Sequence, residues 1–301
     1  MVLGLWLWVV HAQGPRFAAN VNGVVTGMVV TPEDPARIYV ATRRALPDGT
    51  QPRSTLYTSD DGGAHWQELN TSGLEGAGRI VPLTVDYRNP RTLYVVAQAE
   101  SATRLYKSGD AGRRWEVVGT PRNLTALAVD FENPNVLYAA EQLQTYCATA
   151  QFLRSADGGV TWSKFYSERQ QYPPQPIAQI LINPNNPNEF YAVGLSGGSG
   201  RCSNYPVLWR GDRQGNWERM PSPFGDKFYL FPSGLAFDST MNTLYTGTEV
   251  AYGYYSPREG LTMWATTNAS ATTPSLITWT PVSRLDVSPW GWGETFRPLA
   301  I

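Results

Sequence analysis

Five acidic side chains are the best candidates for a catalytic site in this sequence. They are Glu141, Glu168, Asp226, Glu249 and Glu259. Two carboxylates about 5 to 10 Å apart can hydrolyse a glycosidic bond, with one as the acid and the other as nucleophile or base. Nothing in the sequence pairs any two of them. Glycoside hydrolysis therefore stays an alternative, because only the fold could bring two of these carboxylates to the required distance.

Metal, phosphate and nucleic-acid chemistry find little support in the sequence. The chain has two His and two Cys, and it lacks an HExxH pattern and any glycine-rich phosphate loop. We therefore expect no metal and no cofactor. Its formal net charge is -1, so it has no excess of basic residues to offset the phosphates of a nucleic acid. We expect no nucleic-acid partner.

The composition favours an all-β protein. Hydrophobic residues make up 42% of the 301 residues, which is enough to bury a sizeable core. There are 28 Gly and 23 Pro, which are typical of turns, together with 11 Trp and 16 Tyr, which are typical of strands.

A turn motif, SxDxGxxW, recurs along the chain. Three copies align without gaps at 59–66, 108–115 and 155–162, and a fourth at 210–217 keeps the Asp and Trp but moves the Gly. A worn fifth copy covers 263–279 without the Asp and Gly. Gly supplies positive φ in such a turn, while Asp and Ser bind nearby amides, so these residues have a structural role. The structural residues are Ser59, Asp61, Gly63, Trp66, Ser108, Asp110, Gly112, Trp115, Ser155, Asp157, Gly159, Trp162, Asp212 and Trp217.

A second motif precedes each turn. It reads DPARIYVAT at 34–42, NPRTLYVVA at 89–97, NPNVLYAAE at 133–141, NPNEFYAVG at 186–194 and, worn, MNTLYTGT at 241–248. An alternating apolar run lies ahead of every copy. Each unit therefore predicts four strands, and this is typical of one blade of a β-propeller.

These motifs carry a resemblance to a known family. SxDxGxxW resembles the Asp-box, or bacterial neuraminidase repeat. With the NPxxLY strand ahead of it, the chain is similar to sortilin-like propellers, photosystem II assembly-factor-like propellers and the propellers of xyloglucanases. The resemblance covers about residues 26–282 and implies a propeller of four-stranded blades, with five complete blades and a partial one. It indicates function weakly, because enzymes, receptors and assembly factors share these repeats.

The two ends leave alternatives open. Residues 1–13 read either as a secretory signal that lacks its basic leader or as an N-terminal strand, and we expect no other membrane span. Residues 14–301 form a single propeller domain. Residues 296–301 align with an inner strand, so the chain is either a fragment of a larger propeller, or a ring closed by N-terminal strands, or a ring with a surface tail.

One face of the propeller is expected to carry the variable loops. The long connections are 43–54, 98–103, 142–151, 195–206 and 249–260, with inter-blade loops at 167–177, 221–232 and 283–294. Variation on one face indicates where binding is built. Candidate binding residues there are Tyr146, Arg201, Tyr205, Tyr252, Tyr254 and Glu141.

Two cysteines lie on loops of this face. Cys147 and Cys202 precede Ser155 and Arg210 by the same number of residues, which places them at matching positions in adjacent blades. A disulfide between them is expected in an oxidising compartment. Two titratable thiols in the unreduced, denatured protein would refute it.

The enzyme families that this chain resembles place their catalytic groups differently. Sialidases carry an Arg triad and an FRIP motif ahead of the first box, whereas Phe296-Arg297-Pro298 follows the last box and lacks the Ile. Xyloglucanases use two Asp across a cleft between two propellers, and one short chain cannot form that cleft. We therefore expect a non-catalytic, extracytoplasmic propeller that binds a protein or glycan through its long-loop face. The alternative is a sialidase- or xyloglucanase-like glycoside hydrolase, or a fragment of one.

Overall fold

The computed structural model describes most of the chain. The described residues are 23–31, 34–44, 53–74, 77–99, 102–119, 123–143, 149–166, 177–197, 204–224, 230–250 and 261–285. Among them there is no α-helix, and the helical content is one short 3-10 turn, η1 (Pro274–Leu276). No helix among these residues has the length and apolar character needed to cross a membrane. The predicted all-β class is confirmed.

The strands form five four-stranded antiparallel sheets, here called blades I to V. Blade I holds β1 (Val24–Thr31), β2 (Asp34–Arg44), β3 (Arg53–Ser59) and β4 (Gln67–Glu68). Blade II holds β5 (Ala77–Val85), β6 (Leu93–Ala99), β7 (Ala102–Ser108) and β8 (Glu116–Gly119). Blade III holds β9 (Leu124–Val129), β10 (Leu137–Leu143), β11 (Thr149–Ser155) and β12 (Ser163–Lys164). Blade IV holds β13 (Ile177–Ile182), β14 (Glu189–Gly197), β15 (Asn204–Asp212) and β16 (Trp217–Met220). Blade V holds β17 (Leu230–Asp238), β18 (Thr243–Val250), β19 (Leu261–Thr266) and β20 (Thr280–Leu285).

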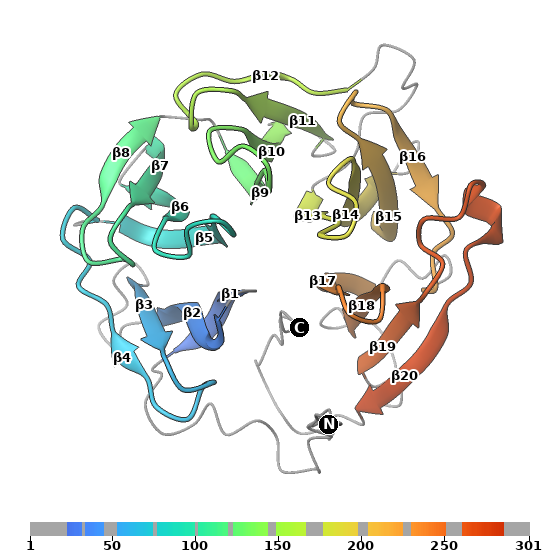
Figure 1. The fold of residues 1–301 in the computed structure, drawn as a ribbon, viewed down its shortest axis with the longest axis horizontal. Helices are drawn as coiled ribbons and strands as arrows, with labels where there is room; N and C mark the ends of the chain where they lie inside the picture. Colours follow the sequence, from blue (N-terminus) through green and yellow to red (C-terminus); the bar gives the residue numbers. More distant parts are fainter. Residues whose placement is uncertain are drawn as a thin grey trace, which may run out of the picture.

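The blades follow one another around a ring (Figure 1). The first strand of each blade lies toward the centre and the fourth lies at the rim, and the first strands of consecutive blades contact each other from β1 to β17. The predicted propeller with five four-stranded blades is confirmed. The expected partial unit at 296–301 and the N-terminal segment 1–13 lie outside the described residues.

The second strand of each blade is covered on both faces. In β10 the residues from Leu137 to Glu141 are all buried, so the strand reads as a continuous apolar run and not as an alternating one. The sheets of blades II, III and IV each lie between a preceding and a following blade, and this arrangement needs such runs. The NPxxLY motif marks this buried strand in the sequence.

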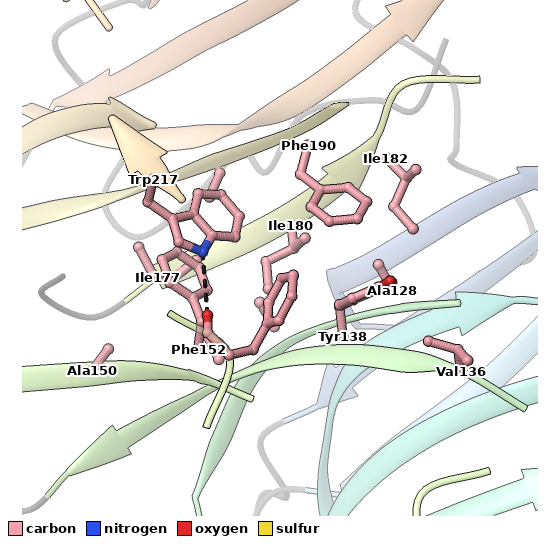
Figure 2. Close-up of a cluster of buried hydrophobic side chains, with 14 residues drawn as sticks. Ala128, Val136, Tyr138, Ala150, Phe152, Ile177, Ile180, Ile182, Phe190 and Trp217 are labelled. Atoms are coloured by element: carbon pink, nitrogen blue, oxygen red, sulfur yellow. Dashed lines mark hydrogen bonds between the residues drawn. The ribbon is translucent and has the colours of Figure 1, made fainter. Parts of the chain in front are cut away.

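The core lies between the blades. Figure 2 shows the cluster between blades III and IV, where Phe152 stacks on Trp217 with ring centroids 3.8 Å apart and planes inclined by 9°. The indole Nε1 of Trp217 donates to the carbonyl oxygen of Phe165 at 3.3 Å. Trp217 begins β16 of blade IV, while Phe152 and Phe165 belong to blade III. This aromatic contact therefore joins the two blades.

The connections between strands lie on two opposite faces of the ring. On the face with the NP and SxDxGxxW turns, β9 ends at Val129 and β10 begins at Leu137, and the longest connection joins Thr266 of β19 to Thr280 of β20. On the opposite face, β18 ends at Val250 and β19 begins only at Leu261. The expectation of a long loop at 98–103 is wrong, because Ala99 pairs directly with Ala102 in a tight hairpin. We call the first face the box face and the second the long-loop face.

Candidate functional site

The carboxylates of three SxDxGxxW turns are engaged by the turns themselves. In each turn the Ser hydroxyl donates to the Asp two residues later and accepts from the Gly amide. The Ser–Asp distances are 2.8 Å for Ser59–Asp61, 2.9 Å for Ser108–Asp110 and 2.7 Å for Ser155–Asp157. The Ser–Gly distances are 2.9 Å for Gly63, 2.8 Å for Gly112 and 2.8 Å for Gly159. These Asp side chains hold their own turns together on the box face.

The fifth turn keeps this geometry with different residues. The Thr266 hydroxyl donates to the Asn268 side-chain oxygen at 2.7 Å, and the same oxygen accepts from the Thr278 amide at 3.1 Å. Thr and Asn offer the same donor and acceptor atoms as Ser and Asp without the charge. A search for Asp and Gly misses this turn, whereas a search for a hydroxyl residue two positions before Asp or Asn finds it.

The fourth turn differs from its sequence alignment. Strand pairing places Gly211 opposite Phe190, just as Ser155 stands opposite Leu137, so Gly211 and not Arg210 takes the Ser position. A Cβ on Gly211 would lie 2.5 Å from the Trp217 ring, which excludes a serine there. Asp212 still accepts from the amides of Gln214 and Asn216, at 2.9 and 3.0 Å.

The turn carboxylates are acidic groups with lowered pKa values. The pKa of Asp157 falls to about 2 because the Thr161 hydroxyl and amide and the Ser155 hydroxyl donate to it. The pKa of Asp61 falls to about 2 because the His65 amide, the His65 ring and the Ser59 hydroxyl do the same. Since the folded pKa is depressed, the stabilisation is present above the ordinary value of 3.8 and is lost as the pH falls toward about 2.

We expect Asp157→Asn to remove this pH dependence from its turn. In the wild type, amide exchange at Thr161 should accelerate between pH 4 and pH 2 beyond the intrinsic change, because the carboxylate protonates. In Asp157→Asn, the protection factor should be lower at pH 7 and flat across the same window. Hydrogen exchange followed by NMR measures both. An identical profile in the two proteins would contradict the role of the charge.

Most of the candidate binding residues lie outside the described residues. These are Tyr146, Arg201, Tyr252 and Tyr254, the cysteines Cys147 and Cys202, and the acids Glu168, Asp226 and Glu259. Tyr205 lies in β15 opposite Ser196, and Glu249 lies in β18 opposite Phe231, but neither side chain is among those described. The disulfide between Cys147 and Cys202 and the binding role of these tyrosines stay predictions.

Glu141 is the candidate whose side chain the structure describes. It lies near the end of β10, close to the long-loop face, and is 6% exposed. Gln151 on the neighbouring strand donates to its Oε2 at 2.5 Å. Among the described residues, Glu141 has no Arg, Lys or His within ion-pair distance. Acidic side chains are rarely this buried without a cation partner.

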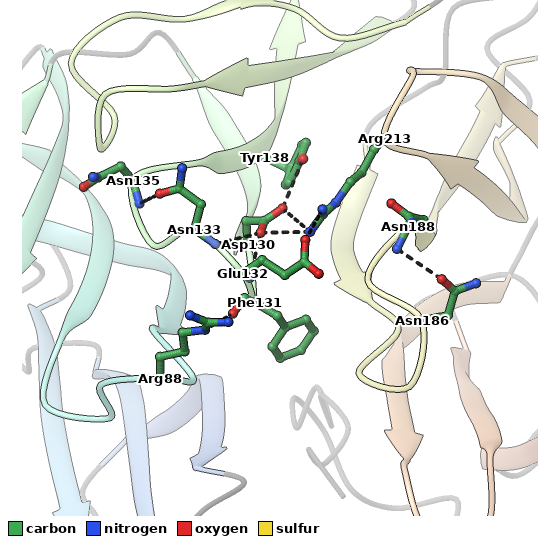
Figure 3. A network of polar contacts seen from close by, with 10 residues as sticks. All are labelled: Arg88, Asp130, Phe131, Glu132, Asn133, Asn135, Tyr138, Asn186, Asn188 and Arg213. Carbon is green, nitrogen blue, oxygen red and sulfur yellow. Dashed lines mark hydrogen bonds and ion pairs between the residues drawn. The ribbon is translucent and has the colours of Figure 1, made fainter.

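A polar network that the sequence analysis did not find joins blades III and IV on the box face (Figure 3). Arg213, in the turn before β16, donates to both oxygens of Asp130 at 2.9 Å and also binds Glu132. Asp130 is 4% exposed and accepts from the Tyr138 hydroxyl at 3.2 Å. Burial, together with the charge of Asp130, raises the pKa of Tyr138, so its hydroxyl keeps the proton that it donates. The partners are too distant in sequence for a motif search to find.

A pocket of about 410 Å³ opens beside this network. Its lining includes Asp130, Tyr138, Arg154, Phe165, Arg213 and Gln214. Among the described residues, no group of His, Cys, Asp and Glu is arranged to hold a metal ion.

Comparisons with solved structures find the same fold in larger proteins. A GH74 enzyme from Niastella koreensis is 19% identical with a TM-score of 0.59, and the match covers 86% of this chain and 37% of that one. The GH74 xyloglucanase from Xanthomonas campestris is 18% identical with a TM-score of 0.56, covering 90% and 39%. A protein of unknown function from Dyadobacter fermentans is 16% identical with a TM-score of 0.53, covering 75% and 72%.

These identities show a shared fold alone, and the chain spans less than two fifths of the length of either GH74 enzyme. No curated protein matches the chain by sequence. The profile of one family, described as the DUF6242 beta propeller domain, matches residues 36–287, which is most of the chain. The chain therefore belongs to the DUF6242 β-propeller domain family.

Proposed function

We propose that this chain is a non-catalytic propeller that binds a protein or glycan partner through its long-loop face. The observation that carries the proposal is Glu141. This carboxylate is 6% exposed, and Gln151 fixes one of its oxygens. Among the described residues no cation lies within ion-pair distance of this buried carboxylate, so a ligand that donates hydrogen bonds to it would gain a partner that is already in place. Glu141 lies near the end of β10, close to the long-loop face, and we therefore propose that the partner binds there.

The box face contrasts with this arrangement. Asp61, Asp110 and Asp157 bind their own turns, and Asp130 is neutralised by Arg213. The geometry of these turns supports the further proposal that the repeats are Asp-boxes of the neuraminidase type. Their carboxylates are structural in that case, and the chemistry of the chain would depend on other residues.

Glycoside hydrolysis is the competing function. Two of the solved structures with this fold are named GH74 enzymes, and one of them is named a xyloglucanase. Hydrolysis needs a second carboxylate within about 5 to 10 Å of the first. Among the described residues, Glu141 is engaged by an amide and not by a second acid. We therefore propose binding, and we choose xyloglucan oligosaccharides as the first glycan probe.

Titration of these oligosaccharides by calorimetry tests the proposal. Glu141→Gln should weaken binding at least about tenfold, because a hydrogen bond to a charged group is worth about 1.5–3 kcal/mol. The exposed residue Glu116, next to the box turn of blade II, provides the matched control Glu116→Gln, which should bind as the wild type does. Equal binding by Glu141→Gln and the wild type would remove Glu141 from the site.

An extracytoplasmic location belongs to the same proposal. It is supported by the apolar run at residues 1–12, which ends in small residues. Fractionation of the native cells tests it, and recovery of the protein only with the cytoplasm would refute it.

A further inference from the structure

A basic residue occupies the same place in blades III and IV. In blade III, Arg154 stands opposite Tyr138 in the pairing of β10 with β11. In blade IV, Arg210 stands opposite Tyr191 in the pairing of β14 with β15. Both tyrosines belong to the repeated NPxxLY strand. The two arginines therefore reach toward the next blade from equivalent positions on the box face.

Arg210 shows which partners this position takes. Its guanidinium binds Glu218 on its own blade, with Nε 2.9 Å from Oε1. Nη1 donates to the carbonyl oxygens of Ala269, at 3.1 Å, and Ala271, at 2.5 Å, in the turn of blade V. The side chain is 12% exposed. With Glu189 Oε1 4.0 Å from Nη1, two carboxylates and two carbonyl oxygens surround Arg210.

Arg154 lacks these partners in the described structure. Ser163 stands opposite Arg154 where Glu218 stands opposite Arg210, so blade III supplies no carboxylate there. The turn of blade IV brings Arg213 to this junction, and Arg213 turns to Asp130 and Glu132, as Figure 3 shows. No ion pair among the described residues involves Arg154. Arg154 instead lies beside Tyr138 and lines the pocket.

Two acids, Asp130 and Glu132, and two arginines, Arg154 and Arg213, line the pocket, so its formal charges balance. Arg213 neutralises Asp130 and binds Glu132 at its exposed edge. Both acids pair with Arg213, so among the described residues Arg154 has a side-chain hydrogen bond with Tyr138 and no ion pair. Phe165 gives the pocket an apolar wall, and Gln214 adds an amide. A volume of about 410 Å³ is within the usual range for small-ligand sites, and it fits one sugar ring or the end of a peptide.

We propose that the pocket between blades III and IV is a binding site for a carboxylate-bearing ligand, anchored by Arg154. The ligand carboxylate takes the place that Glu218 has beside Arg210, and its carbonyl or hydroxyl oxygens take the places of the Ala269 and Ala271 carbonyls. Guanidinium binds carboxylate in a planar, two-bond geometry, which makes Arg the suited anchor. The site lies on the box face and is independent of the long-loop face.

Three probes test the proposal by calorimetry on the full chain. They are the tripeptide N-acetyl-Ala-Ser-Ala with a free carboxylate, the same peptide with a C-terminal amide, and glucuronic acid. The tripeptide copies the segment 269–271 that satisfies Arg210. We expect the free acid to bind at least about tenfold more tightly than the amide, because the charged hydrogen bonds to Arg154 are lost. If glucuronic acid alone binds and needs Arg154, the carboxylate comes from a sugar acid and the proposal stands.

Two variants of the pocket sharpen the test. Arg154→Gln should lower the affinity for whichever probe binds by at least about tenfold. Ser163→Glu gives Arg154 the partner that Arg210 already has, so it should block the same probe while the protein stays folded by circular dichroism. The exposed Arg219 on β16 provides the control Arg219→Gln, which removes one positive charge elsewhere and should bind as the wild type does.

Three results would overturn the proposal. One is equal binding of the acid and the amide. Another is binding that persists unchanged in folded Arg154→Gln and Ser163→Glu. The third is the absence of detectable binding by either acid at concentrations up to about 10 mM.

Discussion

Asp130→Ala is expected to lower the free energy of unfolding by about 3–5 kcal/mol, because it leaves a partly buried arginine without its anion. Asp130 is 4% exposed and binds Arg213 through both oxygens at 2.9 Å. It also accepts from the amides of Glu132 and Asn133 at 2.8 and 3.0 Å. One substitution thus removes an ion pair between blades and the acceptor of an NP turn. Equilibrium unfolding in urea measures the loss.

Asp130→Asn provides the matched control for this prediction. Asn183 holds the equivalent turn of blade IV and accepts from the Asn185 amide at 2.9 Å. The asparagine variant should therefore keep the turn and lose only the charge, with a smaller loss of stability than Asp130→Ala. A loss below about 1 kcal/mol for Asp130→Ala would place it with ordinary surface substitutions and contradict the role given to the network.

Trp217→Ala is expected to cost about 3–5 kcal/mol of stability, because it opens a large cavity between blades III and IV. The side chain is 9% exposed, stacks on Phe152 at 3.8 Å and donates to the Phe165 carbonyl at 3.3 Å. Thermal and urea unfolding measure the cost. A double-mutant cycle with Phe152→Leu should show a coupling of about 0.5–1.5 kcal/mol from the aromatic contact.

Val160→Ala is the control for this cavity. Val160 lies in the box turn of blade III and is 61% exposed, so its truncation should change stability by less than about 0.5 kcal/mol. If Trp217→Ala cost no more than Val160→Ala, the aromatic cluster would not be what joins these blades.

The propeller could be predicted because each blade repeats the same local chemistry. Residues Tyr138 and Tyr191 mark a strand buried on both faces, and Ser155, Asp157 and Gly159 fix a turn by short-range hydrogen bonds. Such signals depend on neighbours in sequence. The fifth turn could be recognised only as a worn copy, because Thr266 and Asn268 form the equivalent hydrogen bond with other side chains. A motif written with one residue type at each position misses a turn in which another residue type forms the same hydrogen bond.

The network and pocket between blades III and IV could not be predicted in this way. Arg213 and Asp130 are 83 residues apart, and they meet only because β9 and the turn before β16 face each other across a blade junction. That Arg154 has no ion pair among the described residues is also invisible in sequence. It follows from the difference between Ser163 and Glu218, and this difference has meaning only once the strand pairing is known.

Release of reducing ends from xyloglucan by the purified protein distinguishes a binding propeller from a glycoside hydrolase. We expect the wild type to bind the oligosaccharides at the long-loop face and to release no reducing ends above the level of Glu141→Gln. Release by the wild type that Glu141→Gln abolishes, with binding retained, would make Glu141 a catalytic acid and the chain a glycoside hydrolase. That result would contradict the proposal of a non-catalytic propeller.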